Sequence, residues 1–177
     1  MPNELSLEQQ KDLISRAKTD LAYFKDLYEY YFPKIYRYLY YRTNNQDDTQ
    51  DLTSQVFLQA IKNFENYNFQ GVSFGAWLYR IAHNLLVNHY KKPSPLYLSA
   101  DKDMPDQKSF EEINQKLDFQ TLHRLVSQLS PEAQQIIALR LSEGLSNQEI
   151  ASVVGTTEAA VKMIFYRSIK KLQTYIK

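Results

Sequence analysis

Residues 130–161 read SPEAQQIIALRLSEGLSNQEIASVVGTTEAAV, a stretch with three helix-start signals. Ser130 stands directly before a proline, which is a typical N-cap and first-turn pair. Ser146 and Glu149 are three residues apart and form the two ends of a capping box. Thr157 offers a third N-cap. The stretch therefore predicts three helices in close succession, the last of which runs to about residue 175.

The last two of these helices have the spacing of a helix-turn-helix. Ala151 is small enough for close backbone approach, Gly155 can take a positive φ in the turn, and Val161 faces inward from the second helix. An ordinary helical hairpin is the alternative. The charge favours the first interpretation, because residues 156–177 carry a net charge of +4, as a helix docked in the major groove of DNA requires.

Upstream, the pattern is helical from Leu5 to Lys92, and no strict apolar and polar alternation is sustained. Helices are predicted at 6–19, from Asp20 to about Tyr31, from Pro33, at about 47–64 and from Ser73 onward. The apolar stripe of the helix at 47–64 comprises Leu52, Val56, Phe57, Ala60, Ile61 and Phe64. In the helix after Ser73, the spacing of Trp77 favours a core role.

A polar and acidic stretch with three prolines, residues 93–112, predicts a flexible linker. We therefore expect an all-α protein of two small helical domains, residues 1–92 and 113–177, joined by this linker. The helix-turn-helix lies in the second domain.

Composition excludes several classes of protein. The 177 residues contain no cysteine, which excludes a disulfide scaffold, a thiolate zinc site and a cysteine nucleophile. Glycine-rich phosphate loops are absent, and the three histidines His83, His89 and His123 lack metal-ligand spacing, so we expect no enzyme and no cofactor. No apolar run approaches the length of a membrane span, which predicts a cytoplasmic protein without membrane insertion.

The near-neutral net charge of +1 hides an uneven distribution. Residues 43–70 and 93–120 each carry −3, whereas residues 71–92 carry +3. One face of the helix after Ser73 is basic and rich in amides, with Arg80, Asn84, Asn88 and Lys91. Such a face can hold a nucleic-acid backbone.

Four strings in both halves are similar to a known family: YFPKIYRYLYYR (31–42), DDTQDLTSQVFLQAI (47–61), FGAWLYRIAHNLLVNHYKK (74–92) and the stretch LSPEAQQ…RSIKKL (129–172). The chain resembles a bacterial RNA polymerase sigma factor of the extracytoplasmic-function (ECF) type, which has only sigma regions 2 and 4. The resemblance covers about residues 20–92 and 118–175. It implies binding to core RNA polymerase and to promoter DNA, with the two motifs in the family's order.

The resemblance implies that the start of the helix at 47–64 contacts the clamp helices of the polymerase β′ subunit, with the β subunit as a further partner. The implied polymerase-binding residues are Asp47, Asp48, Asp51, Gln55 and Phe57. The alternative for each acid is compensation of the helix dipole.

The loop at 65–72 and the next helix correspond to the element that reads and opens the minus-ten sequence. The implied contacts are Asn66, Tyr67, Asn68 and Phe69 as a pocket for an unstacked base, and Arg80, His83, Asn84, Asn88, Lys91 and Lys92 on the strand. His83 stands where the family usually has arginine, which predicts a weaker or pH-sensitive phosphate contact.

The helix after Thr157 corresponds to the element that reads the minus-thirty-five sequence in duplex DNA. The implied contacts are Thr157, Glu158, Lys162, Met163 and Tyr166 to bases, and Arg167, Lys170 and Lys171 to phosphates. Ala160, Met163 and Ile164 depart from the family pattern and leave fewer hydrogen-bonding groups for base edges.

The resemblance also implies an anti-sigma factor as a partner, although no residue identifies it. The rival interpretation is a stand-alone helix-turn-helix regulator that binds duplex DNA without polymerase. The acidic helix, aromatic loop and basic helix of the first half argue against it, because a sensor domain has no need of them.

Overall fold

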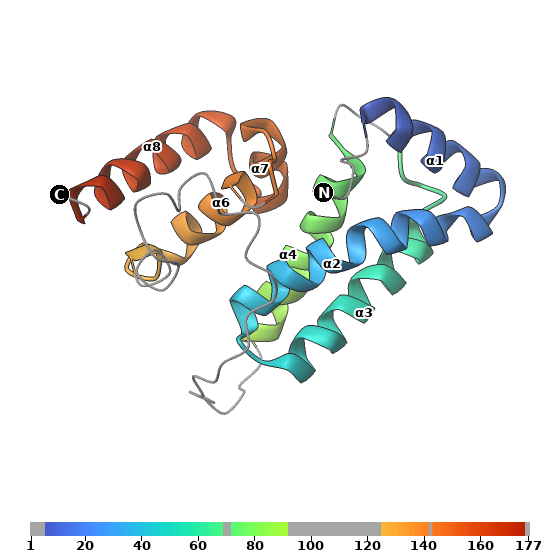
Figure 1. Cartoon of the computed structure of the whole chain (residues 1–177), viewed down its shortest axis with the longest axis horizontal. Coiled ribbons are helices and arrows are strands. Elements are labelled where there is room, and N and C mark those ends of the chain that lie inside the picture. The colour runs from blue at the N-terminus through green and yellow to red at the C-terminus, as the bar shows by residue number, and fades with distance from the viewer. Residues whose placement is uncertain (1–5, 69–71, 92–124, 142, 176–177) are drawn as a thin grey trace. The chain divides into compact units, whose positions relative to one another are not determined.

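The computed structural model describes residues 6–68, 72–91, 125–141 and 143–175, and every regular element in these ranges is a helix (Figure 1). The predicted all-α class is confirmed for them. The chain divides into two compact units, residues 1–101 and 102–177. The predicted linker at 93–112 lies outside the described residues, as does the predicted start of the second domain.

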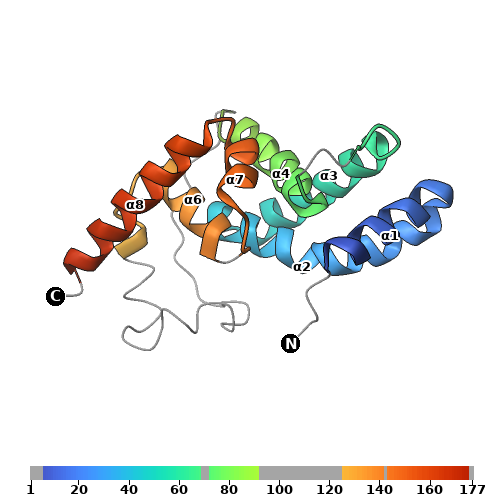
Figure 2. The ribbon, with the colours of Figure 1, turned by 90° about the horizontal axis from the view of Figure 1, so that it is seen from above.

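The first unit contains α1 (Leu7–Thr19), the 3-10 turn η1 (Leu21–Tyr23), α2 (Phe24–Thr43), α3 (Gln46–Asn63) and α4 (Phe74–Lys91). The long helices α2, α3 and α4 pack against one another in all three pairings and enclose one core. Helix α1 packs on η1 and α2 at one end of this unit (Figures 1 and 2).

Aromatic rings join the three long helices. The rings of Phe24, Phe64 and Phe74 meet edge to face, with centroid distances of 5.1 Å, 6.3 Å and 6.0 Å for the three pairs. The Tyr31 ring lies 5.5 Å from that of Phe74. Gly75 permits this approach, since a Cβ at that position would lie 2.9 Å from the Tyr31 ring. Phe24 and Tyr31 belong to α2, Phe64 caps the end of α3 and Phe74 begins α4, so the cluster fixes the start of α4 against α2 and α3.

The predicted helix break before Pro33 is wrong, because α2 runs without interruption through this residue. A proline inside a helix removes a hydrogen bond and costs about 3 kcal/mol. Leu27, Ile35 and Leu39 lie on both sides of it and are all fully buried, and each such side chain contributes about 1.5 to 3 kcal/mol. Packing on both sides of Pro33 therefore outweighs the local penalty.

The helix starts predicted from capping residues are largely confirmed. Ser6 and Gln9 form both hydrogen bonds of a capping box at α1, and the Ser73 hydroxyl accepts from the Ala76 amide at α4. Asp20 differs from the prediction, because its side chain accepts from Ala22 N and caps η1 instead of α2. These local signals suffice where a polar side chain and the first turn it caps are adjacent in sequence.

The second unit contains α6 (Pro131–Leu141), α7 (Asn147–Val154) and α8 (Glu158–Tyr175). The predicted capping box of Ser146 and Glu149 is present, and Gly155 ends α7 in the left-handed conformation with φ of 73°. Ala151 and Val161 are buried between α7 and α8, as the helix-turn-helix requires. The prediction of a helix-turn-helix is confirmed.

Candidate nucleic-acid interface

Helix α4 presents one polar face and buries the other. Arg80, Asn84 and Asn88 are exposed and recur every four residues, so they lie along one line of the helix. Phe74 and Leu78 on the opposite side are fully buried. Arg80 forms no ion pair within the described parts of the chain, which leaves its guanidinium able to neutralise a phosphate.

His83 is half-buried beside this face. Burial lowers its pKa, and the positive charge of Arg42 lowers the pKa further. The imidazole is therefore largely neutral at pH 7. A neutral ring is a weaker phosphate ligand than the arginine that the family usually has at this position.

The loop before α4 exposes two amides and buries its tyrosine. Asn66 and Asn68 are exposed, whereas Tyr67 is only 6% exposed. The Tyr67 ring packs 4.7 Å from that of Trp77 and 5.3 Å from that of Phe74, and its hydroxyl donates to the Val72 carbonyl at 3.5 Å. Burial raises the pKa of Tyr67 to about 12.

The prediction that Tyr67 lines a pocket for an unstacked base does not fit this structure. The Tyr67 ring is buried and packs on Trp77, which is only half-buried and borders the core through its contacts with Tyr67 and Phe74. Phe69 and Lys92 lie outside the described residues, and the side chain of Lys91 does as well.

The start of α3 gathers the predicted polymerase-binding acids. Asn45 caps the helix by accepting from the Asp48 amide, and Asp47 and Asp51 are exposed. Asp48 has a partner within the unit, because its carboxylate lies 3.6 Å from His89 Nε2 of α4. The Gln55 side-chain amide donates to Asp51 at 2.7 Å. Asp47 and Asp51 are thus the acids on this helix most accessible to another protein.

The burial of Phe57 does not fit the prediction that this residue contacts polymerase directly. It is 3% exposed, and its ring packs 4.7 Å from that of Tyr28 and 6.1 Å from that of Phe32. It therefore holds α3 to α2. Ile61 belongs to the same predicted apolar stripe but is 38% exposed, next to Leu58 at 57%. Residues 47, 51, 58 and 61 share one face of α3 by helical spacing, so acids and apolar side chains lie together there.

Helix α8 presents the predicted minus-thirty-five contacts on its outer side. Thr157 caps it by accepting from the Ala160 amide, and Glu158 pairs with Lys162 at 2.7 Å. Met163 and Tyr166 are 51% and 66% exposed. Both side chains are therefore accessible on the surface of the second helix of the helix-turn-helix.

The basic residues of α8 differ in their surroundings. Arg167 and Lys170 are exposed. Lys171 is also exposed, but its amine donates to the Gln128 carbonyl at 3.4 Å, which ties α8 to the turn before α6. Lys171 therefore combines a structural contact with an available charge.

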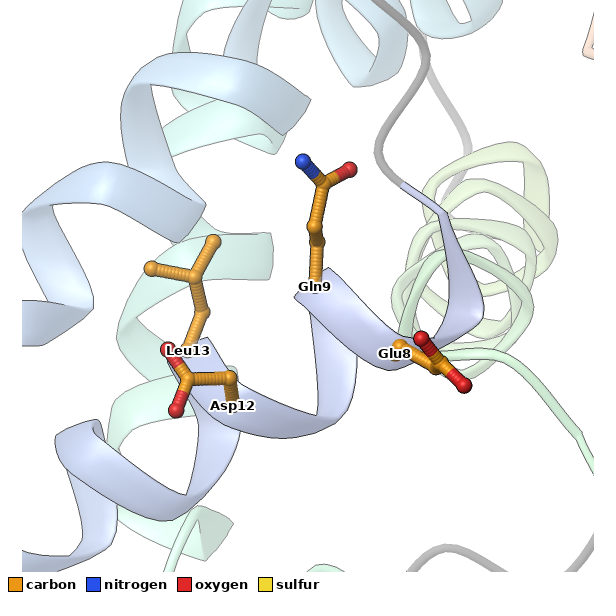
Figure 3. A pocket seen from close by; sticks show the side chains of 4 residues that line it. All are labelled: Glu8, Gln9, Asp12 and Leu13. Carbon is orange, nitrogen blue, oxygen red and sulfur yellow. The ribbon is translucent and has the colours of Figure 1, made fainter.

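A shallow hollow of about 420 Å³ lies along α1 and is lined by Glu8, Gln9, Asp12 and Leu13 (Figure 3). Among the described residues, all four lining side chains come from this one helix.

Sequence reasoning missed two features of the surface. The first is the exposed apolar pair on α3: Leu58 lies outside the predicted stripe, and Ile61, which belongs to it, is exposed as well. Lys18 of α1 lies against the loop before α4, where its amine donates to Asn68 Oδ1. No local pattern links two residues so distant in sequence.

Comparison with known proteins places this geometry in a family. The family models Sigma-70 region 2 and Sigma-70, region 4 match residues 27–94 and 119–172. The ECF RNA polymerase sigma factor BldN of Streptomyces coelicolor is 35% identical over 167 residues, which are 91% of this chain and 63% of BldN. The chain belongs to the sigma-70 family, ECF type. This sigma factor is also 26% identical to the RNA polymerase sigma factor YlaC of Bacillus subtilis, over 84% of this chain and 89% of YlaC.

Solved structures share the fold of this sigma factor. The sigma factor RpoE of Bartonella quintana, crystallised with the anti-sigma factor NepR, superimposes with a TM-score of 0.69 at 20% identity, over 85% of this chain and 94% of that one. CnrH, in complex with the cytosolic domain of CnrY, gives a TM-score of 0.68 at 18% identity, over 94% and 96% of the two chains. No helix within the described ranges has the length and apolar character needed to cross a membrane.

Proposed function

We propose that this sigma factor binds core RNA polymerase and directs promoter-specific initiation, recognising and opening promoter DNA. One observation carries the proposal: the first unit exposes both an acidic helix start on α3 and, on α4, Arg80 in line with two amides. A domain that only sensed a signal or dimerised would have no need of both surfaces. The role is one of binding, and no chemical step of its own is required.

The polymerase contact is proposed for the outer face of α3. Asp47 and Asp51 can engage basic side chains of the β′ clamp helices, with the β subunit as a further contact. Leu58 and Ile61 add exposed apolar area to the same face. Such a combination of charge and apolar surface suits a protein partner, because charge steers the encounter and burial of apolar area stabilises the complex.

The promoter contacts are divided between the two units. We place the minus-ten strand on Arg80, Asn84 and Asn88 of α4, next to the exposed amides of the preceding loop. We place the minus-thirty-five duplex on α8, with Met163 and Tyr166 at base edges. The side chains of Ala160, Met163 and Ile164 offer few hydrogen-bonding groups to base edges. We therefore expect thymine-methyl contact and DNA shape to carry much of the sequence specificity.

The domain division that this function needs is residues 1–92, a linker at 93–112, and residues 113–177. The family-model matches at 27–94 and 119–172 fit within this scheme to within two residues. We also propose a cytoplasmic location and regulation by an anti-sigma factor, as in the complex of RpoE with NepR.

Binding to core polymerase separates this proposal from a stand-alone regulator. We expect the chain to co-elute with core RNA polymerase, and the double variant Asp47→Lys, Asp51→Lys to lose most of that binding. The matched control is Asp26→Lys, which reverses an exposed acid in the first turn of α2. A chain that bound promoter duplex tightly but showed no affinity for core polymerase would be a stand-alone regulator.

Promoter opening tests the role of α4. The double variant Arg80→Ala, Asn84→Ala should impair strand opening, followed by permanganate reactivity of unpaired thymines, more than it impairs initial duplex binding. Lys25→Ala, which removes an exposed cation already paired with Glu29, is the control. An equal loss of opening and of initial binding would count against the minus-ten assignment.

A further inference from the structure

Lys18 of α1 lies beside the loop that precedes α4, although 50 residues separate it from its partner there. Its Nζ donates a hydrogen bond of 3.5 Å to Oδ1 of Asn68. Lys18 is exposed, and no acid among the described residues forms an ion pair with it. A positive charge from the first helix is thus held at the rim of this loop.

The backbone that carries Lys18 is anchored by the fold. Ile14 and Ala17 of the same helix are buried, at 7% and 2% exposure. The Arg16 guanidinium lies 4.4 Å from the centroid of the Tyr23 ring and holds the end of α1 against η1. The position of Lys18 therefore does not depend on one long hydrogen bond.

The loop itself lacks a cation. Lys62 is the single Lys or Arg between residues 43 and 70, against four acids. The exposed loop residues Asn66 and Asn68 are neutral. A single strand that follows this loop brings a phosphate with every nucleotide, and neutralising phosphates supplies much of the binding free energy. Lys18 supplies a charge that the loop sequence does not.

A phosphate can readily replace Asn68 as the hydrogen-bond acceptor of Lys18. At 3.5 Å, this bond from an ammonium to an uncharged amide oxygen is longer than the usual range of about 2.7–3.2 Å and is weak. A phosphate oxygen is itself charged, so a bond from the ammonium to phosphate is shorter, at about 2.7–2.9 Å, and stronger. Bound DNA would therefore replace the weak hydrogen bond between Lys18 and Asn68 with a stronger bond between Lys18 and a phosphate.

We propose that Lys18 is a further DNA contact of this sigma factor, binding a backbone phosphate of the single promoter strand held by the loop before α4. The inference rests on the proposed minus-ten function. It gives α1, which precedes the residues matched by the region 2 family model, a direct part in DNA binding.

The test uses holoenzyme assembled from core polymerase and the full chain. Wild-type holoenzyme first selects a minus-ten oligonucleotide from a random single-stranded pool, and the selected oligonucleotide is labelled with fluorescein. Binding is then titrated by anisotropy between 50 and 200 mM salt for the wild type, Lys18→Ala, Lys18→Arg, Asn68→Ala and the control Lys25→Ala.

Loss of one phosphate contact on single-stranded DNA should reduce the slope of log affinity against log salt by about 0.7. The affinity advantage of the wild type over Lys18→Ala should therefore shrink about 2.6-fold from 50 to 200 mM salt. Lys18→Arg should restore the slope, Lys25→Ala should not change it, and Asn68→Ala should keep the wild-type slope.

Two results with Lys18→Ala would overturn the inference and leave the proposed minus-ten function standing. If Lys18→Ala weakened binding equally at every salt concentration, as we expect of Asn68→Ala, Lys18 would only hold the loop in place and would not contact DNA. If Lys18→Ala bound like the wild type at every salt concentration, it would have no role. A wild-type holoenzyme that selected no oligonucleotide would overturn the proposed minus-ten function together with this inference.

Discussion

Replacing Tyr67 separates support of the minus-ten loop from direct contact with a base. The ring is 6% exposed and packs on Trp77 and Phe74. Truncating a buried aromatic ring to alanine costs about 3 to 5 kcal/mol. The hydroxyl contributes little of this, because its bond to the Val72 carbonyl is 3.5 Å long and a neutral hydrogen bond contributes about 1 kcal/mol or less.

The expected result follows from these two magnitudes. Tyr67→Ala should lower the free energy of unfolding of the first unit by about 3 to 5 kcal/mol. Tyr67→Phe should lower it by less than about 1 kcal/mol and leave promoter opening nearly intact. Tyr67→Leu, which keeps apolar volume, should lie between them.

Trp77 provides the assay, because it is the only tryptophan of the chain and lies 4.7 Å from the Tyr67 ring. Urea unfolding followed by its fluorescence reports on the first unit, and permanganate footprinting measures opening by the same variants. The reasoning would be refuted if Tyr67→Ala unfolded at the wild-type urea concentration and yet abolished opening. That combination would mean that the ring contacts a base.

Three further predictions concern single residues. The pKa of His83 is lower in the folded chain than in the unfolded chain, so folding favours the neutral imidazole. The contribution of His83 to stability is therefore present above about pH 6.5 and is lost as the pH falls through the folded pKa. Wild-type protein should thus lose more stability between pH 7 and pH 5.5 than His83→Gln does, in urea titrations at the two pH values; an identical loss would contradict the assignment. Gly155→Ala, at φ of 73°, should destabilise the helix-turn-helix by about 1 kcal/mol, seen as faster amide exchange in α7, whereas unchanged exchange would argue against strain there. Lys171→Ala should lower duplex affinity almost uniformly across sequences and reduce the salt slope by about 0.9; a change in sequence preference would show that Lys171 reads bases.

Local signals in the sequence predict the helix starts well. Ser6, Ser73 and Ser146 each cap the helix expected of them, because a cap depends only on the next three residues. Gly155 likewise meets a local demand for positive φ. The all-α class and the helix-turn-helix follow from such signals together with apolar spacing.

Tertiary packing explains the positions at which the structure differs from the predictions made from the sequence. Pro33 predicts a helix break, but buried residues on both sides keep α2 continuous. The resemblance assigns the aromatic residues Tyr67 and Phe57 to binding surfaces. The same residue types serve binding pockets and cores, so only the structure assigns both to the core. The contact of Lys18 with Asn68 joins segments 50 residues apart and leaves no trace in either local sequence.

Run-off transcription tests the central claim most directly. Core RNA polymerase, supplied with a library of promoter fragments, is assayed with and without this sigma factor. We predict transcripts from a defined subset of fragments only when the sigma factor is present, and their loss with the variant Asp47→Lys, Asp51→Lys but not with Asp26→Lys. A wild-type chain that bound no core polymerase and started no transcript would contradict the account.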